Sequence, residues 1–391
     1  MRRLLSILGL VAGLLGTPVG AQTLPQPPEL AVRAYLLLDL TSDQELAARE
    51  ADAPVQPASL TKLMTAYLVF DALRLGRLNL DQRLPVSELA QRQPGSRMFL
   101  EAGKRVPVED LVKGLLVQSG NDAAITLAEG VGGSVERFVQ LMNEQAQALG
   151  MKATRFANPT GLTQAGHQSS ARDLAILGTR LLRDFPDYAH FHAIRKYRYE
   201  GTPPANDGNR NLLLFRDPSV DGLKTGHTEA AGYCMVATAS RNFPNLGAGD
   251  APGPRRLLAV VLGADNENAR AGETQKLLNW GFSAFEAVKL FDANQPVLSP
   301  AVWKGSAATV PLGRARPVVV AVPVGMAGRL RVQAVRPEPL VAPLARGQVT
   351  GALKVYVGER TLTEYPLVAL EPVGQAGLLG RAWDAFRLWV Q

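Results

Sequence analysis

A buried helix that begins with a serine and a lysine one turn apart is the feature that most constrains this chain. Residues 60–70 contain no glycine or proline, and their apolar side chains fall on several faces of a helix. Such a pattern predicts a helix that other elements surround. Ser59 lies at the start of this helix and Lys62 follows three residues later, so their side chains share one face.

This spacing has a chemical interpretation. The free N–H groups at the start of a helix favour an anion or a developing oxyanion. Burial lowers the pKa of a lysine, and a neutral amine can take the proton of a neighbouring hydroxyl. Ser59 is therefore a candidate nucleophile and Lys62 is its candidate base. The alternative is a helix-capping serine followed by a lysine whose ammonium reaches solvent.

The composition is that of a globular chain. Its 391 residues are 46% hydrophobic and 20% charged, enough for two or three domains. The formal net charge of +7 suits a negatively charged envelope or lipid surface, and no basic cluster interleaved with aromatics predicts a nucleic-acid partner. Cys234 is the only cysteine and the four histidines form no metal-type pair, so neither a disulfide, a metal nor another cofactor is expected.

Residues 1–21 are predicted to be a secretory signal peptide. Arg2 and Arg3 precede an apolar stretch over residues 4–15, and small residues at 19–21 predict cleavage before Gln22. The stretch is short for a membrane span, although an uncleaved anchor is the alternative. We therefore expect an exported protein, with residues 22–29 as a linker.

The order of predicted elements indicates an α+β fold. Two strand-like runs near the N-terminus precede several helical segments, and three more strand-like runs follow them. One antiparallel sheet built from both ends of residues 30–290, with helices packed on it, accounts for this order. The strand-like runs are 34–40, 44–49, 220–227, 233–239 and 257–262.

The C-terminal part has a different character. Residues 291–376 contain short β-rich runs separated by proline and glycine, which predicts a small, sandwich-like all-β domain. Residues 377–391 follow as an amphipathic helix whose basic residues lie outside its apolar face. This pattern predicts a helix in a membrane interface, and a helix docked on its own domain is the alternative. The apolar face consists of Leu378, Leu379, Trp383, Phe386, Trp389 and Val390.

Two further motifs can carry chemistry. Ser119-Gly-Asn121 is predicted in a loop between helices, where a hydroxyl can pass a proton and an amide can hold a substrate carbonyl. Lys224-Thr225-Gly226 is predicted in a strand, where the glycine permits a ligand to approach the backbone closely. Alone, each motif is equally consistent with an ordinary turn or cap.

Together and in this order, the three motifs resemble the signature of β-lactamases and penicillin-binding proteins. The chain is similar to low-molecular-mass penicillin-binding proteins, the D-alanyl-D-alanine carboxypeptidases of serine peptidase family S11. The similarity covers roughly residues 30–290, and the β-rich part and terminal helix match the family's usual tail. The matching segments are 57–62, 118–122, 209–211, 221–228 and 231–233.

The resemblance implies a role for each motif residue. Ser59 would be the acylated nucleophile and Lys62 its base. Ser119 would relay the proton, Asn121 would position the substrate, and Lys224 would polarise the site.

Substrate contacts follow from the same resemblance. Thr225 and Arg210 would bind the terminal carboxylate of D-alanine. Gly226 would leave room for the substrate backbone, and the backbone N–H groups of Ser59 and His227 would form the oxyanion hole. The family often has histidine where this chain has threonine at position 160, which is expected to be a contact within a loop.

The implied reaction removes the terminal D-alanine from peptidoglycan stem pentapeptides through an acyl-enzyme. β-Lactams would inhibit it covalently. The protein would lie at the periplasmic face of the bacterial inner membrane, held peripherally through residues 377–391.

Other functions of the same fold remain alternatives. A β-lactamase uses a glutamate to activate its deacylating water, and residues 151–170 contain no acidic residue. A D,D-endopeptidase is a nearer alternative, which the β-rich part and terminal helix disfavour. A non-catalytic envelope-binding scaffold is the alternative outside enzymes, and the complete set of motif residues argues against it.

Overall fold

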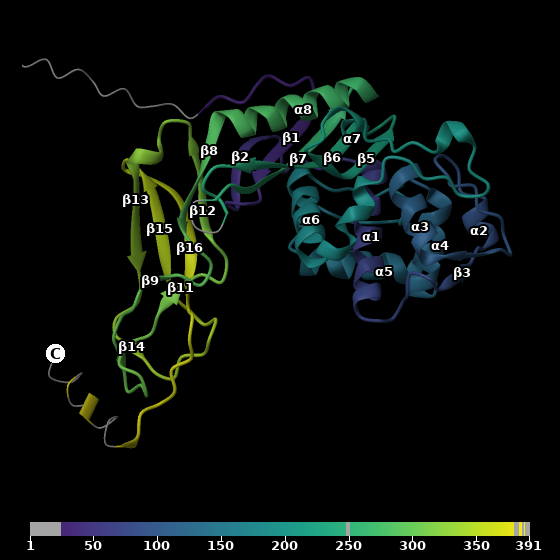
Figure 1. The fold of residues 1–391 in the computed structure, drawn as a ribbon. Helices are drawn as coiled ribbons and strands as arrows, with labels where there is room; N and C mark the ends of the chain where they lie inside the picture. The colour runs from purple at the N-terminus through teal and green to yellow at the C-terminus, as the bar shows by residue number, and fades with distance from the viewer. Residues whose placement is uncertain (1–24, 248–250, 379–382, 385–386, 388–391) are drawn as a thin grey trace, which may run out of the picture.

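The computed structural model describes residues 25–247, 251–378, 383–384 and 387, so the predicted signal peptide lies outside the described residues. In the first unit, residues 25–284, a five-stranded antiparallel sheet has the order β2-β1-β7-β6-β5. Both ends of the unit contribute strands, which confirms the predicted α+β architecture (Figure 1). The strands are β1 (Ala34–Asp39), β2 (Gln44–Arg49), β5 (Val220–Thr228), β6 (Gly232–Phe243) and β7 (Gly253–Ala264).

Helices bury both faces of this sheet. Helix α8 lies along one face, where α7 joins it, and α1 and α6 lie against the other, with α2–α5 packed beyond them (Figure 1). A small hairpin, β3 (Arg83–Pro85) with β4 (Arg105–Pro107), borders α4. The helices are η1 (Ala58–Thr61), α1 (Lys62–Arg74), α2 (Glu88–Gln91), α3 (Val108–Lys113), η2 (Gly114–Gln118), α4 (Asn121–Gly132), α5 (Val135–Ala148), α6 (Ala171–Asp184), η3 (Pro186–Ala193), η4 (Pro204–Asn206), α7 (Leu213–Arg216) and α8 (Glu267–Ala284).

Successive side chains of a strand point to opposite faces of the sheet. Because helices cover both faces here, the central strands are apolar at consecutive positions. In β1, Leu36 packs with the helices of the α1 side and Leu37 packs with α8. Leu258 and Leu257 of β7 divide in the same way. This two-sided burial makes the sheet a rigid support for the residues at its edge.

Helix α1 is enclosed, as its sequence predicted. All of its residues except Asp71 and Arg74 are buried. Its first turn differs from a regular α-helix, because Ser59 lies in the 3₁₀ turn η1 and Lys62 is the first α-helical residue. The side chains of Ser59 and Lys62 nevertheless face the same side, since three residues complete one 3₁₀ turn.

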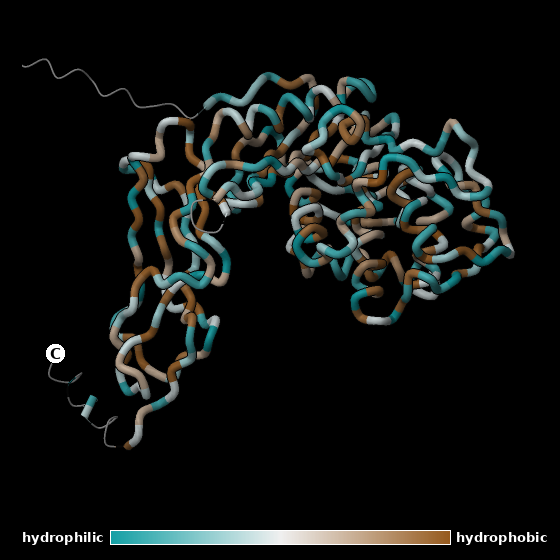
Figure 2. The backbone as a smooth tube through the Cα atoms, viewed as in Figure 1, coloured by the Kyte–Doolittle hydropathy of each residue, from teal (hydrophilic) through white to brown (hydrophobic). Residues whose placement is uncertain are grey.

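The second unit, called here the β-domain, comprises residues 285–376. The boundary predicted from the sequence followed residue 290, whereas β8 already pairs with β12 from residue 285 onward. The apolar residues form two small clusters along its strands (Figure 2). The elements are β8 (Phe285–Phe291), β9 (Pro296–Leu298), β10 (Val302–Trp303), β11 (Leu312–Gly313), β12 (Val318–Pro323), η5 (Ala327–Arg329), β13 (Leu330–Val335), β14 (Leu340–Val341), β15 (Val349–Val357) and β16 (Arg360–Ala369).

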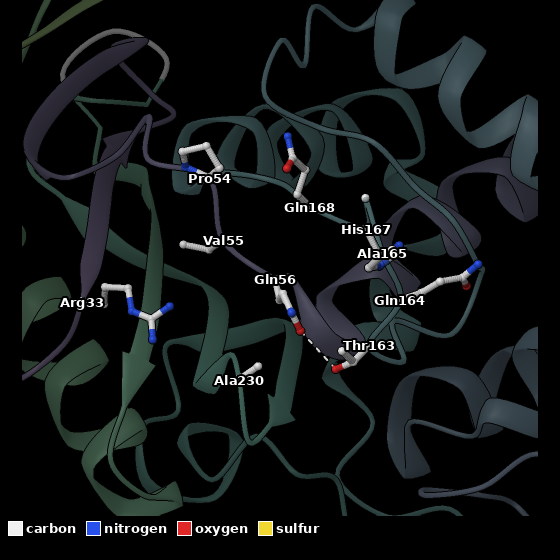
Figure 3. Close-up of a pocket in the computed structure, with 11 residues that line it drawn as sticks. Arg33, Pro54, Val55, Gln56, Thr163, Gln164, Ala165, His167, Gln168 and Ala230 are labelled. Atoms are coloured by element: carbon white, nitrogen blue, oxygen red, sulfur yellow. Dashed lines mark hydrogen bonds between the residues drawn. The ribbon is translucent and has the colours of Figure 1, made fainter.

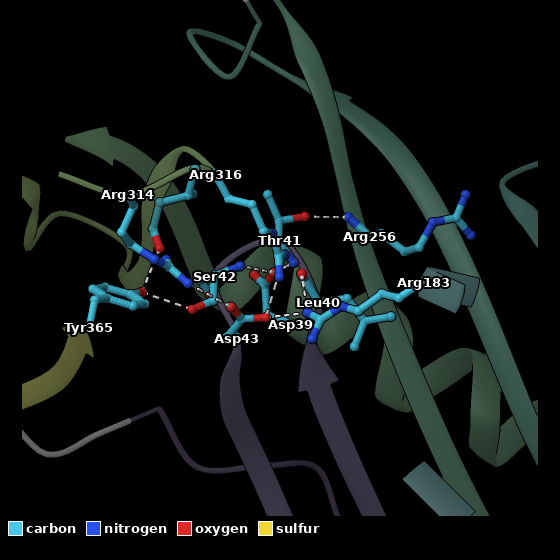
Figure 4. A network of polar contacts seen from close by, with 11 residues as sticks. Asp39, Leu40, Thr41, Ser42, Asp43, Arg183, Arg256, Arg314, Arg316 and Tyr365 are labelled. Carbon is cyan, nitrogen blue, oxygen red and sulfur yellow. Dashed lines mark hydrogen bonds and ion pairs between the residues drawn. The ribbon is translucent and has the colours of Figure 1, made fainter. Parts of the chain in front are cut away.

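The turn between β1 and β2 joins the two units (Figure 4). The Gln44 side chain donates to and accepts from the backbone of Ala321 in β12, at 3.1 and 2.7 Å. The Tyr365 hydroxyl lies 2.8 Å from the carbonyl oxygen of Ser42. Asp43 pairs with arginines of both units, which fixes the β-domain beside the sheet. These arginines are Arg183, Arg314 and Arg316.

The described part of the tail contacts the β-domain through polar groups. The Asp384 carboxylate accepts a hydrogen bond from the backbone N–H of Lys304 at 2.6 Å, and the Arg387 guanidinium lies 5.3 Å from the centre of the Trp303 ring. Most of the helix predicted over residues 377–391 lies outside the described residues. In the described ranges, no helix combines the length and hydropathy that crossing a membrane requires.

Candidate active site

Lys62 and Ser59 form a direct contact at the start of α1. The Nζ atom of Lys62 lies 2.9 Å from Oγ of Ser59, 2.6 Å from Oδ1 of Asn121 and 2.6 Å from the carbonyl oxygen of Thr160. Lys62 has no exposed surface. Burial lowers the pKa of its ammonium from 10.5 to about 7, and the charge of Asp122 opposes this shift only in part.

The arrangement suits a neutral amine. A neutral lysine has two N–H groups and one lone pair. Because Asn121 Oδ1 and Thr160 O accept hydrogen bonds and cannot donate them, they take the two N–H groups. The lone pair is then left facing the hydroxyl of Ser59, in the geometry that proton abstraction needs.

The Ser119–Asn121 loop supplies the opposite wall. The Asn121 side chain donates to the carbonyl of Pro94 at 2.7 Å, which turns its Oδ1 toward Lys62. Ser119 ends η2 in the left-handed conformation, with φ of 61°. A non-glycine residue in this conformation is uncommon and is often held so at functional sites. Here it aims the Ser119 hydroxyl at Lys224, whose Nζ donates to it at 2.9 Å.

Lys224 lies in a buried cluster of positive charge. Its Nζ donates to the carbonyl of Thr225 at 2.9 Å as well as to Ser119. Burial lowers the pKa of Lys224 well below its usual value, and the positive charges of Lys62, Arg270 and Arg210 lower it further. A site where several cations converge favours a bound anion.

Two glycines allow the backbone to close around Ser59. A side chain at Gly226 of β5 would place its Cβ 3.0 Å from the backbone nitrogen of Ser59. A side chain at Gly161, where φ is +86°, would place its Cβ 1.9 Å from the carbonyl oxygen of Ala58. The edge strand and the loop after Thr160 therefore both lie directly against the Ser59 turn.

The other predicted substrate contacts lie at the rim. Thr225 is buried in β5, and His227 is exposed, with its ring tilted by 31° against that of Tyr233 at 4.0 Å between ring centres. Arg210 is exposed and its guanidinium donates to Oδ1 of Asn206 at 3.1 Å. The structure thus brings the serines and lysines into contact and leaves Arg210 beside them, close enough for its charge to act on Lys224.

Two residues, Thr160 and Asp122, contribute to this site although the sequence analysis gave them no catalytic or substrate-binding role. Thr160 was expected only to contact its own loop, which its hydroxyl does, but its carbonyl also accepts from Lys62. A backbone carbonyl leaves no signal in the residue type. The Asp122 carboxylate accepts from the backbone N–H groups of Met98 and Leu100, each at 3.0 Å. The available sequence signal for Asp122 was its position directly after Asn121 in the motif.

His167 ties the loop to the nucleophile helix. Its Nδ1 accepts from the backbone N–H of Ala157 at 2.9 Å, so its Nε2 carries the proton and donates to Oγ1 of Thr61 at 2.8 Å. Burial lowers the pKa of His167 to about 4, which keeps the ring neutral. In the described residues, no three His, Cys, Asp or Glu side chains are placed to hold a metal ion.

Comparison with known proteins places the chain in a family. Residues 21–266 match the peptidase S11 family of D-alanyl-D-alanine carboxypeptidases, and residues 285–375 match the C-terminal domain of penicillin-binding protein 5. The chain belongs to the S11 family of D-alanyl-D-alanine carboxypeptidases, which confirms the resemblance inferred from the three motifs.

Individual relatives are similar over most of their length. The D-alanyl-D-alanine carboxypeptidase DacC of Escherichia coli is 38% identical over 376 residues, covering 94% of this chain and 90% of the relative. Penicillin-binding protein 5 of Haemophilus influenzae has a TM-score of 0.81 at 34% identity, covering 90% of this chain and 100% of that structure. Penicillin-binding protein D2 of Listeria monocytogenes, solved with cefotaxime bound, has a TM-score of 0.58 at 31% identity, covering 66% of this chain and 100% of that structure.

Proposed function

We propose that this protein removes the terminal D-alanine from peptidoglycan stem pentapeptides through an acyl-enzyme on Ser59. Family membership supports the reaction class. The observation that carries the residue assignment is the buried Lys62 amine, which lies 2.9 Å from Ser59 Oγ and has a pKa of about 7. An amine with this pKa can exchange protons at neutral pH.

Acylation begins when Lys62 takes the proton of Ser59. Oγ of Ser59 then attacks the carbonyl carbon of the penultimate D-alanine, and the backbone N–H groups of Ser59 and His227 stabilise the oxyanion. Ser119 relays this proton from Lys62 to the nitrogen of the leaving D-alanine as its C–N bond breaks, which returns Lys62 to its neutral form. This leaves an ester between Ser59 and the shortened stem peptide.

Deacylation reverses these roles with water as the nucleophile. Lys62 takes a proton from water, the hydroxide attacks the ester carbonyl, and the proton returns to Oγ of Ser59 as the ester bond breaks. The product is a tetrapeptide stem with a free carboxylate.

The terminal carboxylate of the substrate binds in the cation cluster. Arg210 and Thr225 contact it, with Lys224 adjacent, and Asn121 holds the substrate amide. The lowered pKa of Lys224 among neighbouring cations supports an anion site here. A β-lactam would acylate Ser59 through its ring carbonyl, a proposal supported by the relative solved with cefotaxime bound.

The test is D-alanine release from a peptide ending in D-Ala-D-Ala, together with covalent labelling by a fluorescent penicillin. Ser59→Ala should abolish both signals while its circular dichroism stays that of wild type. Ser283→Ala, an exposed serine on α8, is the matched control and should keep both. A covalent penicillin adduct on Ser59→Ala would show that another residue is the nucleophile.

We also propose that the protein is exported and held at the periplasmic face of the inner membrane by residues 377–391. The side chain of Trp383, which is 63% exposed, supports this proposal. Exposed tryptophan beside basic residues suits a membrane interface.

Membrane fractionation tests this localisation. Deletion of residues 377–391 should release active enzyme into the soluble fraction, because the proposed catalytic residues lie far earlier in the chain. The full-length protein, washed at high salt, is the control. If the truncated protein still sediments with membranes, another segment is the anchor.

A further inference from the structure

A cavity of about 510 Å³ lies beside the Ser59 turn (Figure 3). Residues 54–56, which lead into that turn, form one wall, and residues 163–168 form another. Ala230, in the turn after β5, and Arg33, just before β1, complete the lining. The cavity therefore lies at the end of the sheet where β5 finishes and β1 begins.

Two walls of the cavity belong to segments that lead to the candidate active site. The Thr163 hydroxyl donates to Oε1 of Gln56 at 3.0 Å and links the two walls. Thr163 follows Thr160, whose carbonyl contacts Lys62, by only three residues.

The direction of the bound peptide follows from the sheet. β5 is an edge strand, and an extended peptide can add to a free sheet edge. With its terminal carboxylate near Lys224 and its scissile carbonyl at Ser59, the preceding residues of the peptide run toward Thr228 and Ala230. An extended chain advances about 3.3 Å per residue, so the residues before D-Ala-D-Ala extend past Ser59 in the direction of Ala230, which lines the cavity.

The lining has the chemistry of a polar site with one positive charge. Amide and hydroxyl groups line it, and none of the lining residues carries a carboxylate. His167 is neutral, since burial lowers its pKa to about 4. Arg33 forms no ion pair with any residue in the described part of the chain. The polar lining residues are Gln56, Thr163, Gln164 and Gln168.

We propose that this cavity is a subsite in which Arg33 binds a carboxylate of the stem-peptide residues that precede D-Ala-D-Ala. The proposal rests on the carboxypeptidase function proposed above. The guanidinium can pair with a carboxylate through two parallel hydrogen bonds. In a stem peptide, that carboxylate belongs either to the isoglutamyl residue or to a diaminopimelyl residue.

The experiment compares a long and a short substrate on the full-length enzyme. The measured quantity is kcat/KM for a stem pentapeptide that carries both carboxylates, divided by kcat/KM for N-acetyl-D-Ala-D-Ala. Arg33→Gln should lower this ratio about 3- to 10-fold, because Arg33 is exposed and an exposed guanidinium pair contributes modestly. Arg33→Lys should recover part of it, and Arg92→Gln, at an exposed arginine directly after α2, should leave it unchanged.

Two further substrates identify the carboxylate. One has isoglutamine in place of isoglutamate and the other has lysine in place of diaminopimelate. The substrate whose turnover no longer depends on Arg33 has lost the carboxylate that Arg33 binds. As a test independent of charge, Ala230→Trp should fill the cavity and raise KM for the long substrate more than for the short one.

The failures are distinguishable. If Arg33→Gln leaves the ratio unchanged, or if both altered substrates keep their dependence on Arg33, the subsite is wrong while D-alanine release by the wild type stands. If the wild type releases D-alanine from neither the long nor the short substrate, the proposed function itself fails and the subsite fails with it.

Discussion

Two buried lysines lie in the site, and the Nζ atom of each is 2.9 Å from a serine hydroxyl oxygen. Lys62 contacts Ser59, and Lys224 contacts Ser119. Their surroundings differ. Lys62 has two neutral oxygen acceptors and the carboxylate of Asp122 nearby, whereas Lys224 lies among other cations.

We infer from this difference that the two lysines have different roles. The pKa of Lys62 is held near neutrality, so its amine can lose and regain a proton during turnover. Lys224 lies in an excess of positive charge that an incoming anion would balance. We infer that a bound substrate carboxylate raises the pKa of Lys224 and stabilises its charged form. Four predictions test this division of roles.

The largest effect is expected for Lys62→Arg. Arginine stays protonated and cannot act as a base. Acylation by a fluorescent penicillin should therefore slow by about 10²- to 10⁴-fold, the usual contribution of a general base. Stopped-flow labelling measures this rate. Acylation at nearly the wild-type rate would mean that another group takes the Ser59 proton.

Lys224→Arg should do less harm, because arginine keeps the positive charge that Lys224 is proposed to supply. We expect a loss of about 10- to 100-fold in kcat/KM, caused by the poorer fit of a guanidinium to the Ser119 hydroxyl. The comparison is made with Lys224→Met, which removes the charge and should lose more. If the two variants are equally impaired, charge at Lys224 is not what matters.

The pH dependence of acylation reports on Lys62. When the pH is below the Lys62 pKa of about 7, the amine is protonated and cannot act as a base. The acylation rate should therefore fall about tenfold for each pH unit below 7 and level off above 7. Penicillin labelling from pH 5 to pH 9 measures this profile. A rate that decreases as the pH rises through 7 would contradict a neutral Lys62.

Arg210→Ala should have the smallest and most selective effect. A carboxypeptidase must recognise a free C-terminal carboxylate, and an exposed guanidinium pair contributes modestly. We expect kcat/KM for a peptide with a free terminus to fall about 3- to 10-fold, with little change for the same peptide amidated at its C-terminus. An equal loss on both peptides would remove Arg210 from carboxylate binding.

Parts of the site were predictable because they depend on local geometry. Ser59 and Lys62 are three residues apart at a helix start, and helix geometry alone puts their side chains on one face. The buried character of α1 followed from apolar residues on all its faces. The antiparallel sheet followed from the order of strands and helices, and it was confirmed. The role of Arg210, in contrast, came only from the family resemblance, since an arginine in a loop has no local signal.

The tertiary structure decided what depends on distant residues. Ser119 and Lys224 are 105 residues apart in the sequence, and only the folding of the chain brings their side chains to 2.9 Å. The carbonyl of Thr160 reaches Lys62 because Gly161 lets its loop lie against the Ser59 turn.

The pKa of Lys62 and the start of the β-domain are further examples. A lysine in a sequence is expected to be charged, and complete enclosure by other elements is what lowers the pKa of Lys62 to about 7. From the sequence, most of Phe285–Phe291 was assigned to the first unit. Its pairing with β12 shows that this strand belongs to the β-domain. The sequence by itself thus determined which groups can do the chemistry, because residue types and short spacings are local properties. The folded chain determined their proton affinities and contacts, because burial and distance depend on residues far apart in the sequence.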